Sequence, residues 1–219
     1  MKLWKLLDLY TGVAGAYRGY ELAGFEVTGV DIALQPDHPG TFVQADALEY
    51  LESHGHEFDF IHASPPCQRD CSLTAGTNHR LRETYPDLYP PTRALLERIG
   101  KPYVIENPAA RPDVVLCGEM FGLRVIRHRN FELGGWSTDQ PAEPEHRGLT
   151  LGMRHGKLIT PTNGGYYFAV YGNGGYKGTV AQWQDAMGIH WTNNRKSIAE
   201  AIPPAYTEWV GTEFLRRNV

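Results

Sequence analysis

Short hydrophobic runs alternate with amphipathic stretches through the first half of the chain. The hydrophobic runs predict buried strands at residues 6–10, 25–30, 41–44, 58–62 and 102–105. Apolar residues at helical spacing predict helices at residues 16–23, 47–53 and 92–99, two of which are followed by a glycine. Strands that alternate with helices in this way favour an α/β fold built on a parallel sheet.

The pattern changes in the second half. Residues 69–91 have no periodicity and contain three prolines, as is typical of a functional or mobile segment. Residues 123–133 are expected to be extended. From residue 134 to about 177 the chain is rich in Gly, Pro, Tyr and His, and helices are expected at residues 180–187 and 204–217. We therefore expect an α/β sheet domain interrupted late by a small irregular subdomain.

Composition narrows the class of protein. Of the 219 residues, 42% are hydrophobic and 21% are charged, which is a globular balance. No apolar run is long enough to span a bilayer, so we expect a soluble cytoplasmic protein with no membrane partner. Three cysteines are too few for a disulfide scaffold, and no CxxC or HExxH motif indicates zinc. The net charge of −4 argues against a protein that binds nucleic acid through a strongly basic surface, but it does not exclude a local basic groove.

The first candidate motif follows the first predicted strand. It reads Asp8-Leu9-Tyr10-Thr11-Gly12-Val13-Ala14-Gly15. Glycines there let the backbone approach a ligand at the carboxyl edge of the sheet. Asp31, after the second strand, could accept both hydroxyls of a ribose, and Asp46, after the third, could accept an exocyclic amine. Adenosylmethionine is the ligand we favour, while a plain tight turn or a dinucleotide site stays open because G-x-G-x-x-G is absent.

A cysteine between a strand and a mobile loop forms the second motif, Ser64-Pro65-Pro66-Cys67-Gln68. Two prolines hold the backbone extended, which would present the thiol at the sheet edge. A thiolate there is a competent nucleophile if nearby positive charge lowers its pKa. A buried structural cysteine is the alternative, and it is the interpretation we favour for Cys71 and Cys117.

Two further motifs carry charge. Glu106 ends another strand of the same sheet, where it would serve as a proton donor or hold the edge of a ring, although a plain surface charge is the alternative. Arg127 and Arg129 flank His128, and strand alternation would send both to one face. Because neighbouring guanidinium groups repel, an anion or carbonyl partner is expected, unless they lie on a solvated edge strand.

Taken in order, these four motifs resemble the DNA cytosine-5 methyltransferase family. The first matches its cofactor loop, Pro66-Cys67-Gln68 its nucleophile motif, Glu106-Asn107 its catalytic Glu-Asn, and Arg127 with Arg129 its paired arginines. The resemblance covers nearly the whole chain and is strongest to the compact versions of bacteriophages and their hosts, where such enzymes also serve restriction–modification. Residues 116–123 and 201–206 support it. It implies a Rossmann-like adenosylmethionine-dependent methyltransferase sheet with a small irregular target-recognition subdomain.

The resemblance also implies a role for each matched residue. Cys67 would attack C6 of a flipped cytosine, and Glu106 would hold N3 and the exocyclic amine. Arg129 would contact O2, and Arg127 would position the loop or a phosphate. S-adenosylmethionine would be bound by Tyr10 through stacking, by Asp31 at the ribose and by Asp46 at the adenine, with further contacts from Thr11, Gly12, Val13, Ala14, Gly15, Ile32 and Pro66. No metal is required.

The resemblance also implies how the chain is divided. It predicts a catalytic and cofactor-binding domain at residues 1–133, a target-recognition region at 134–195 and a C-terminal helix returning to the catalytic domain at 196–219. A recognition region this small should read about two to four base pairs of double-stranded DNA, since each base needs its own contact. A monomer is expected.

Three departures from the family pattern stand out. Ala14 replaces the usual second glycine of the cofactor loop, and Pro108 follows the Glu-Asn pair where valine is commoner. The family's C-terminal Gly-Asn pair aligns with Ala199-Glu200, so its asparagine contact is not carried over.

Three alternatives to this function stay open. The same chemistry on RNA or a free cytosine nucleotide would fit the low basic charge. A catalytically silent cofactor- or DNA-binding protein would have no need of Cys67 and Glu106. An exocyclic-amine methyltransferase would share Ser64-Pro65-Pro66 but would have an aromatic residue in place of Cys67.

Overall fold

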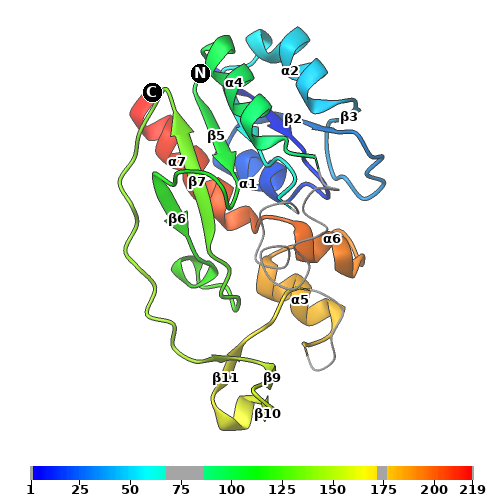
Figure 1. Ribbon diagram of the computed structural model, residues 1–219, viewed down its shortest axis with the longest axis vertical. Helices are drawn as coiled ribbons and strands as arrows, with labels where there is room; N and C mark the ends of the chain where they lie inside the picture. Colours follow the sequence, from blue (N-terminus) through cyan, green and yellow to red (C-terminus); the bar gives the residue numbers. More distant parts are fainter. Residues whose placement is uncertain (1, 68–85, 172–176, 219) are drawn as a thin grey trace.

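A single mixed sheet forms the centre of the protein in the computed structural model, which describes residues 2–67, 86–171 and 177–218 (Figure 1). Within those residues the sheet has seven strands in the order β3-β2-β1-β4-β5-β7-β6. The first five are parallel, and β7 runs antiparallel to both β5 and β6. The strands are β1 (Lys5–Leu9), β2 (Glu26–Asp31), β3 (Phe42–Gln44), β4 (Phe60–Ala63), β5 (Tyr103–Glu106), β6 (Val114–Leu116) and β7 (Arg129–Gly134).

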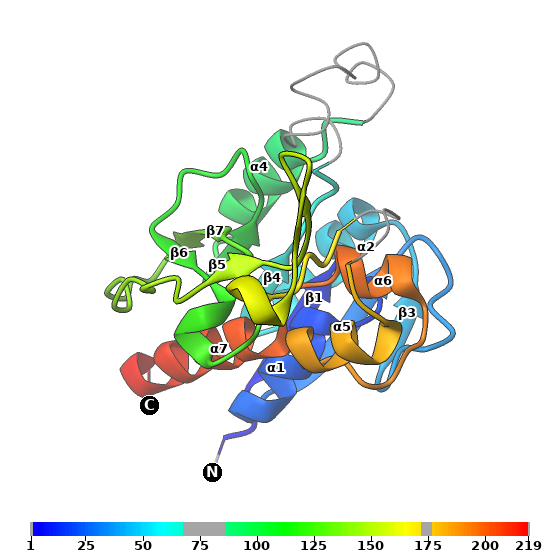
Figure 2. The ribbon, with the colours of Figure 1, turned by 90° about the horizontal axis from the view of Figure 1, so that it is seen from below.

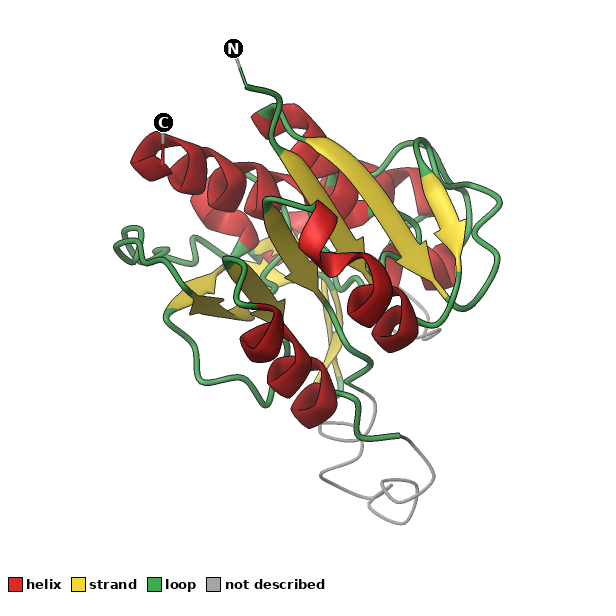
Figure 3. Cartoon of the chain, turned by 90° about the horizontal axis from the view of Figure 1, so that it is seen from above, coloured by secondary structure: helices red, strands yellow, loops and turns green. Residues whose placement is uncertain are grey.

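Helices cover both faces of this sheet, which confirms the expected α/β class (Figure 3). Successive side chains of a strand point to opposite faces, so Leu6 packs with α1 and α7 while Leu7 packs with α2 and α4. Strands buried on both faces read as continuous apolar runs, as these do. The covering helices are α1 (Gly15–Ala23), α2 (Ala47–His54), α4 (Tyr89–Ile99) and α7 (Pro204–Asn218), with a 3₁₀ turn η1 (Gly55–Glu57) after α2.

The first and last of these helices pack very closely. A Cβ atom on Gly19 would lie 2.1 Å from the carbonyl oxygen of Pro204, so a side chain has no room there. Thr207 Oγ1 donates a hydrogen bond to the carbonyl oxygen of Ala16 at 2.9 Å. The C-terminal helix is therefore an integral layer of the sheet domain.

A second, smaller core lies at the carboxyl end of the parallel strands. Trp183 and Ile198 pack with Val125 and Phe168, and Figure 2 shows α5 and α6 side by side there. Trp191 Nε1 donates to the carbonyl oxygen of Val13 at 2.7 Å, which ties this core to the sheet domain. Its elements are α5 (Val180–Met187) and α6 (Arg195–Glu200), preceded by short strands and a turn, β8 (Leu149–Thr150), β9 (Gly152–Arg154), β10 (Lys157–Ile159), η4 (Pro161–Asn163) and β11 (Gly165–Tyr167).

Five local features differ from the sequence expectations. The extended segment begins as a strand only at Arg129, so Arg127 and His128 precede β7. Helix α4 starts three residues before the expected 92–99, because prolines are favourable in the first turn. Strand β6 and helix α6 were not predicted, nor was the 3₁₀ turn η3 (Gly118–Phe121).

Gln68, Cys71 and most of the aperiodic segment at 69–91 lie outside the described residues. Among the helices of the described ranges, none is long and apolar enough to cross a membrane.

Candidate active site

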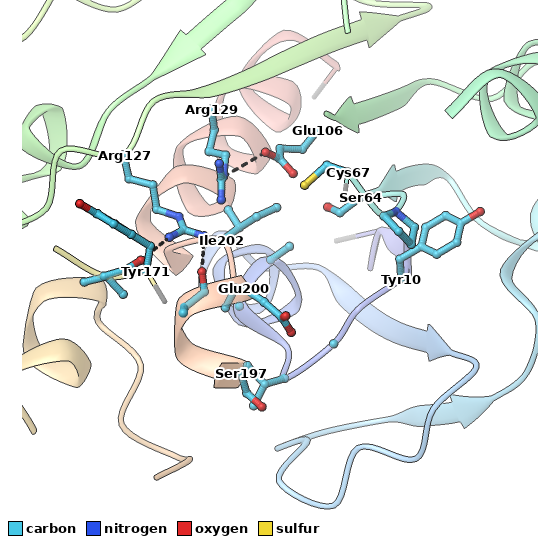
Figure 4. A pocket seen from close by; sticks show the side chains of 18 of the residues that line it. Tyr10, Ser64, Cys67, Glu106, Arg127, Arg129, Tyr171, Ser197, Glu200 and Ile202 are labelled. Atoms are coloured by element: carbon cyan, nitrogen blue, oxygen red, sulfur yellow. Dashed lines mark hydrogen bonds and ion pairs between the residues drawn. The ribbon is translucent and has the colours of Figure 1, made fainter. Parts of the chain in front are cut away.

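A cavity of about 1600 Å³ opens at the carboxyl edge of the parallel strands. All the candidate site residues except Ala14 line it (Figure 4). They divide along the edge by strand order, because β1, β2 and β3 lie on one side and β4, β5 and β7 on the other. The first group carries the residues assigned to a cofactor except Pro66. The second carries Pro66, the thiol, the carboxylate and the arginine pair.

The turn between β1 and α1 has an unusual backbone. Tyr10, Gly12 and Ala14 all have positive φ, at 61°, 52° and 71°. Glycine adopts positive φ without steric cost, whereas alanine does not. The conformation at Ala14 is therefore one that suits the glycine found at this position of the family pattern. The turn is fixed by a hydrogen bond from Gly12 N to Asp31 Oδ2 at 3.0 Å. Strained backbone of this kind is typical of ligand sites.

The two aspartates after β2 and β3 hold the backbone as well as facing the cavity. Asp31 accepts from Gly12 N through one carboxylate oxygen and from Ala33 N through the other, at 2.9 Å. Asp46 is the N-cap of α2, and its Oδ1 accepts from Leu48 N at 2.9 Å. This cap was missed from the sequence, although an aspartate just before an apolar helical run is its usual signal.

Below the turn lies a buried carboxyl group that sequence reasoning did not single out. Asp8 accepts a hydrogen bond from Thr11 Oγ1 at 2.6 Å through Oδ2. Its Oδ1 is buried and has no hydrogen-bond partner within the described residues. Burial raises the pKa of Asp8 to about 7. Near neutral pH this carboxyl group is therefore partly protonated and can donate as well as accept a hydrogen bond.

The segment that carries the thiol is held by the strand beside it. Ser64 to Cys67 follow β4, and Asn107, which follows the neighbouring β5, donates through Nδ2 to the carbonyl oxygen of Pro65 at 3.0 Å. Cys67 is half-buried and lines the cavity, and Figure 4 shows its sulfur on the same side as Glu106 and Arg129. Asn107 is thus a positioning residue for the segment, a role that sequence reasoning did not assign.

A buried hydrogen-bonded chain reaches the same segment from the core. Tyr20 Oη lies 2.9 Å from His62 Nδ1, and His62 Nε2 lies 2.8 Å from Ser64 Oγ. Burial lowers the pKa of His62 to about 3, so the imidazole is neutral at physiological pH. Nothing in the sequence indicates the hydrogen bond between His62 and Ser64. His62 lies within a buried strand and has apolar neighbours, so its position looks like any other core position.

The two arginines have the kinds of partner expected of them. Arg129 Nε lies 3.1 Å from Glu106 Oε1 in an ion pair. Arg127 donates through Nη1 to the carbonyl oxygen of Val170 at 3.0 Å and through Nη2 to that of Ala199 at 2.5 Å. Burial and the charge of Arg129 lower the pKa of Arg127 to about 9, while the charges of Glu106 and Cys67 act in the opposite direction. Arg127 therefore contributes positive charge near the thiol, while Arg129 is paired with Glu106.

The segment that departs from the family pattern also lies at the cavity. Ala199 contributes the backbone carbonyl that Arg127 binds, and the side chains of Ser197, Glu200 and Ile202 line the wall (Figure 4). Helix α6 and the residues that follow it therefore form one wall of the cavity. Glu200 stands there at the position where the family has an asparagine.

Comparison with known proteins gives a match by structure alone. The sequence matches no protein-family profile and no curated protein. A prophage-encoded E. coli protein described as a DNA modification methyltransferase superposes with a TM-score of 0.66 at 14% identity, over 98% of this chain and 99% of its own. The Entamoeba histolytica methyltransferase EhMeth gives 0.62 at 11% identity and the S. pombe Dnmt2 methyltransferase 0.61 at 12%, each over the whole of both chains.

These similarities extend from end to end, so they include the second core as well as the sheet. They confirm the Rossmann-like fold that the ordered motifs imply, at an identity too low for alignment of the sequences alone to reveal it. The protein therefore has the methyltransferase fold that these three proteins share.

Proposed function

We propose that the protein transfers a methyl group from S-adenosylmethionine to C5 of cytosine in DNA. The observation that carries this proposal is the position of Cys67 and Glu106. They follow or end the neighbouring strands β4 and β5, and both line one cavity with the turn after β1. A proline-framed thiol, a carboxylate and two arginines at one sheet edge have no common structural purpose, whereas cytosine methylation uses all of them.

The cofactor half of the cavity suits adenosylmethionine. The turn at Tyr10 to Gly15 brings backbone close to the ligand, and Tyr10 offers an aromatic face. One oxygen of Asp46 makes no bond to the helix it caps and is available for the adenine amine. When bound, adenosylmethionine supplies an electrophilic methyl group.

The other half suits a cytosine that has left the helix stack. Such extrusion is required because C5 and C6 are shielded inside a duplex. The positive charge of Arg127, which interacts with Cys67, favours the thiolate form as nucleophile. The sulfur forms a bond to C6 and makes C5 nucleophilic. Glu106 holds N3 and the exocyclic amine and offsets charge that develops on the ring. After methylation a base removes the C5 proton, and the electron pair expels Cys67.

The recognition region is proposed to lie between β7 and α6. Thr150, Leu151, Met153 and Tyr171 from this region line the same cavity, and Met153 and Tyr171 are exposed. Exposed apolar and aromatic side chains beside the opening can contact an unstacked base. We propose that this region reads a short site in duplex DNA and that the chain acts as a monomer in a bacterial cytoplasm.

Methyl transfer to cytosine-containing duplexes tests the proposal. Labelled adenosylmethionine is incubated with the protein and with Cys67→Ala. Label on C5 with the native protein and none with the variant is expected. Duplexes that carry 5-fluorocytosine should in addition trap a covalent Cys67–DNA adduct, because fluorine cannot leave as the C5 proton does.

The alternatives give different outcomes in the same assay. Transfer to RNA or to a cytosine nucleotide but not to duplexes would change the substrate class. This outcome is tested because the net charge of −4 is low for a protein that binds duplex DNA. Label on the exocyclic amine would overturn the C5 assignment. Cofactor binding without transfer to any of them would indicate a silent binder.

A further inference from the structure

A cysteine and two histidines lie together beside the candidate active site. Cys117 follows β6, His128 immediately precedes β7, and His146 lies in the long segment between β7 and β8. Their potential ligand atoms all lie within 4.8 Å of one another. Cys117 Sγ is 3.6 Å from His146 Nε2, and the rings of His128 and His146 have centroids 5.2 Å apart.

One pair of ligand atoms in the cluster has the separation found in a tetrahedral zinc centre. Zinc binds thiolate sulfur at about 2.3 Å and imidazole nitrogen at about 2.0–2.1 Å, so tetrahedral angles place sulfur and nitrogen about 3.6 Å apart. The Cys117–His146 distance of 3.6 Å equals this separation. One sulfur and two nitrogens form a donor set that selects zinc over magnesium or calcium, which prefer oxygen.

The three ligands are held in place by the surrounding fold. Leu116 pairs with Arg129 across β6 and β7, so the next residues along, Cys117 and His128, face each other at the end of this pairing. The buried Glu119 accepts hydrogen bonds from the backbone N–H groups of His146 and Arg147. A site whose ligands are already positioned loses little freedom when the ion binds.

We propose that Cys117, His128 and His146 bind a structural zinc ion, with water as the fourth ligand. The histidines are exposed, so water reaches the open position. On binding, the thiol proton of Cys117 leaves to solvent and the thiolate coordinates the metal. The ion would fasten the segment that contains His146 to the residue between Arg127 and Arg129. It would thereby stiffen the arginine pair without taking part in methyl transfer.

Cobalt and zinc titrations of the metal-free protein test this site. Co²⁺ bound by a thiolate gives a sulfur-to-metal charge-transfer band, and one equivalent per chain is expected to saturate it. His146→Ala and His128→Ala should each weaken Zn²⁺ binding by more than about 100-fold, since loss of even a second-shell partner costs up to that much. Zn²⁺ should raise the melting temperature of the native protein but not of these variants.

Two matched controls distinguish the cluster from other metal-binding groups. His155 is another exposed histidine with positive φ, at 48°, and His155→Ala should bind Zn²⁺ as the native protein does. Cys67→Ser should keep the Co²⁺ band, whereas Cys117→Ser should lose it while circular dichroism shows a folded protein. A band that survives in Cys117→Ser, or equal Zn²⁺ affinity in His146→Ala and His155→Ala, would overturn the proposal. Neither result bears on methyl transfer by Cys67.

Discussion

The Cα atom of Gly15 faces the carbonyl oxygen of Ile202 so closely that a Cβ atom on residue 15 would lie 2.2 Å from that oxygen. The first residue of α1 is thus fitted against the backbone that leads into α7. This contact also forms part of the cavity wall, because both residues line it. The turn proposed to bind the cofactor therefore depends on chain almost two hundred residues away.

Gly15→Ala should destabilise the protein by about 2–3 kcal/mol, because neither backbone can move far from the clash. Urea unfolding measures the loss. Gly188→Ala is the control, since its position has positive φ but nothing within 4 Å, and it should cost only about 1 kcal/mol. Equal losses in the two variants would mean that the close contact with Ile202 is easily relieved.

Substitutions of Asp46 should separate its helix cap from its proposed contact with adenine. Asp46→Ala should lower the free energy of unfolding by about 1 kcal/mol, since the cap of α2 is lost. Asp46→Asn keeps the cap and the stability, because asparagine caps equally well. It should still weaken adenosylmethionine binding about tenfold, since its amide N–H₂ cannot accept from the adenine amine. Calorimetry that finds unchanged affinity in Asp46→Asn would remove Asp46 from the cofactor site.

Asp8 and His62 should have opposing effects on the pH dependence of stability. Burial raises the pKa of Asp8 from 3.8 to about 7, so between those values the folded state binds the extra proton and stability falls as pH rises. Burial lowers the pKa of His62 from 6.5 to about 3, so there the unfolded state binds the extra proton and stability rises with pH. Each slope reaches about 1.4 kcal/mol per pH unit, and the two cancel between about pH 4 and 6.5.

Single substitutions should expose each slope. Asp8→Asn should lose stability steadily on acidification below about pH 6.5, because only the His62 slope remains. His62→Gln should instead gain stability over the same range as Asp8 is protonated. Urea unfolding at a series of pH values measures both. Parallel pH profiles for the native protein and the two variants would contradict the assignment.

Arg127 should be more important for stability than an exposed arginine with similar bonds. Arg127→Lys should cost about 1–3 kcal/mol, because a lysine cannot reach both Val170 O and Ala199 O and leaves one of these carbonyls without a donor. Arg124 also donates twice to a backbone carbonyl, that of Tyr166, but is exposed. Arg124→Lys should therefore change stability by less than about 0.5 kcal/mol. A comparable loss in both would show that burial of Arg127 adds nothing.

Sequence reasoning found the elements whose signal is local. Leu6 and Leu7 belong to a run buried on both faces, which identifies a parallel strand without further information. Glycine at residue 24 ends α1 in the left-handed conformation that helix ends favour. The carboxyl ends of parallel strands meet at one edge of the sheet, so the polar residues that follow these strands lie together there. The cavity residues could therefore be named from the sequence.

What escaped prediction depends on distant partners. Strand β6 has three residues and exists by pairing with β7, and α6 has six residues. The two carbonyl groups that hold Arg127 come from residues 43 and 72 positions away, and no spacing along the chain announces them. The Cys117–His128–His146 cluster is likewise invisible as a motif, because its members meet only after three segments fold together.

The contact between α1 and α7 also affects how the chain folds during its synthesis. Residues 204–218 cover the apolar face of α1, yet a ribosome produces them about 190 residues after Ala16. Until then Phe25 lacks its ring contact with Phe214, and an uncovered apolar face favours aggregation. Contacts so far apart in sequence also form slowly. Chains that lack residues 204–218, whether nascent or cut, are therefore expected to depend on chaperones or be degraded, and the cofactor turn gains its full support only once those residues have been made.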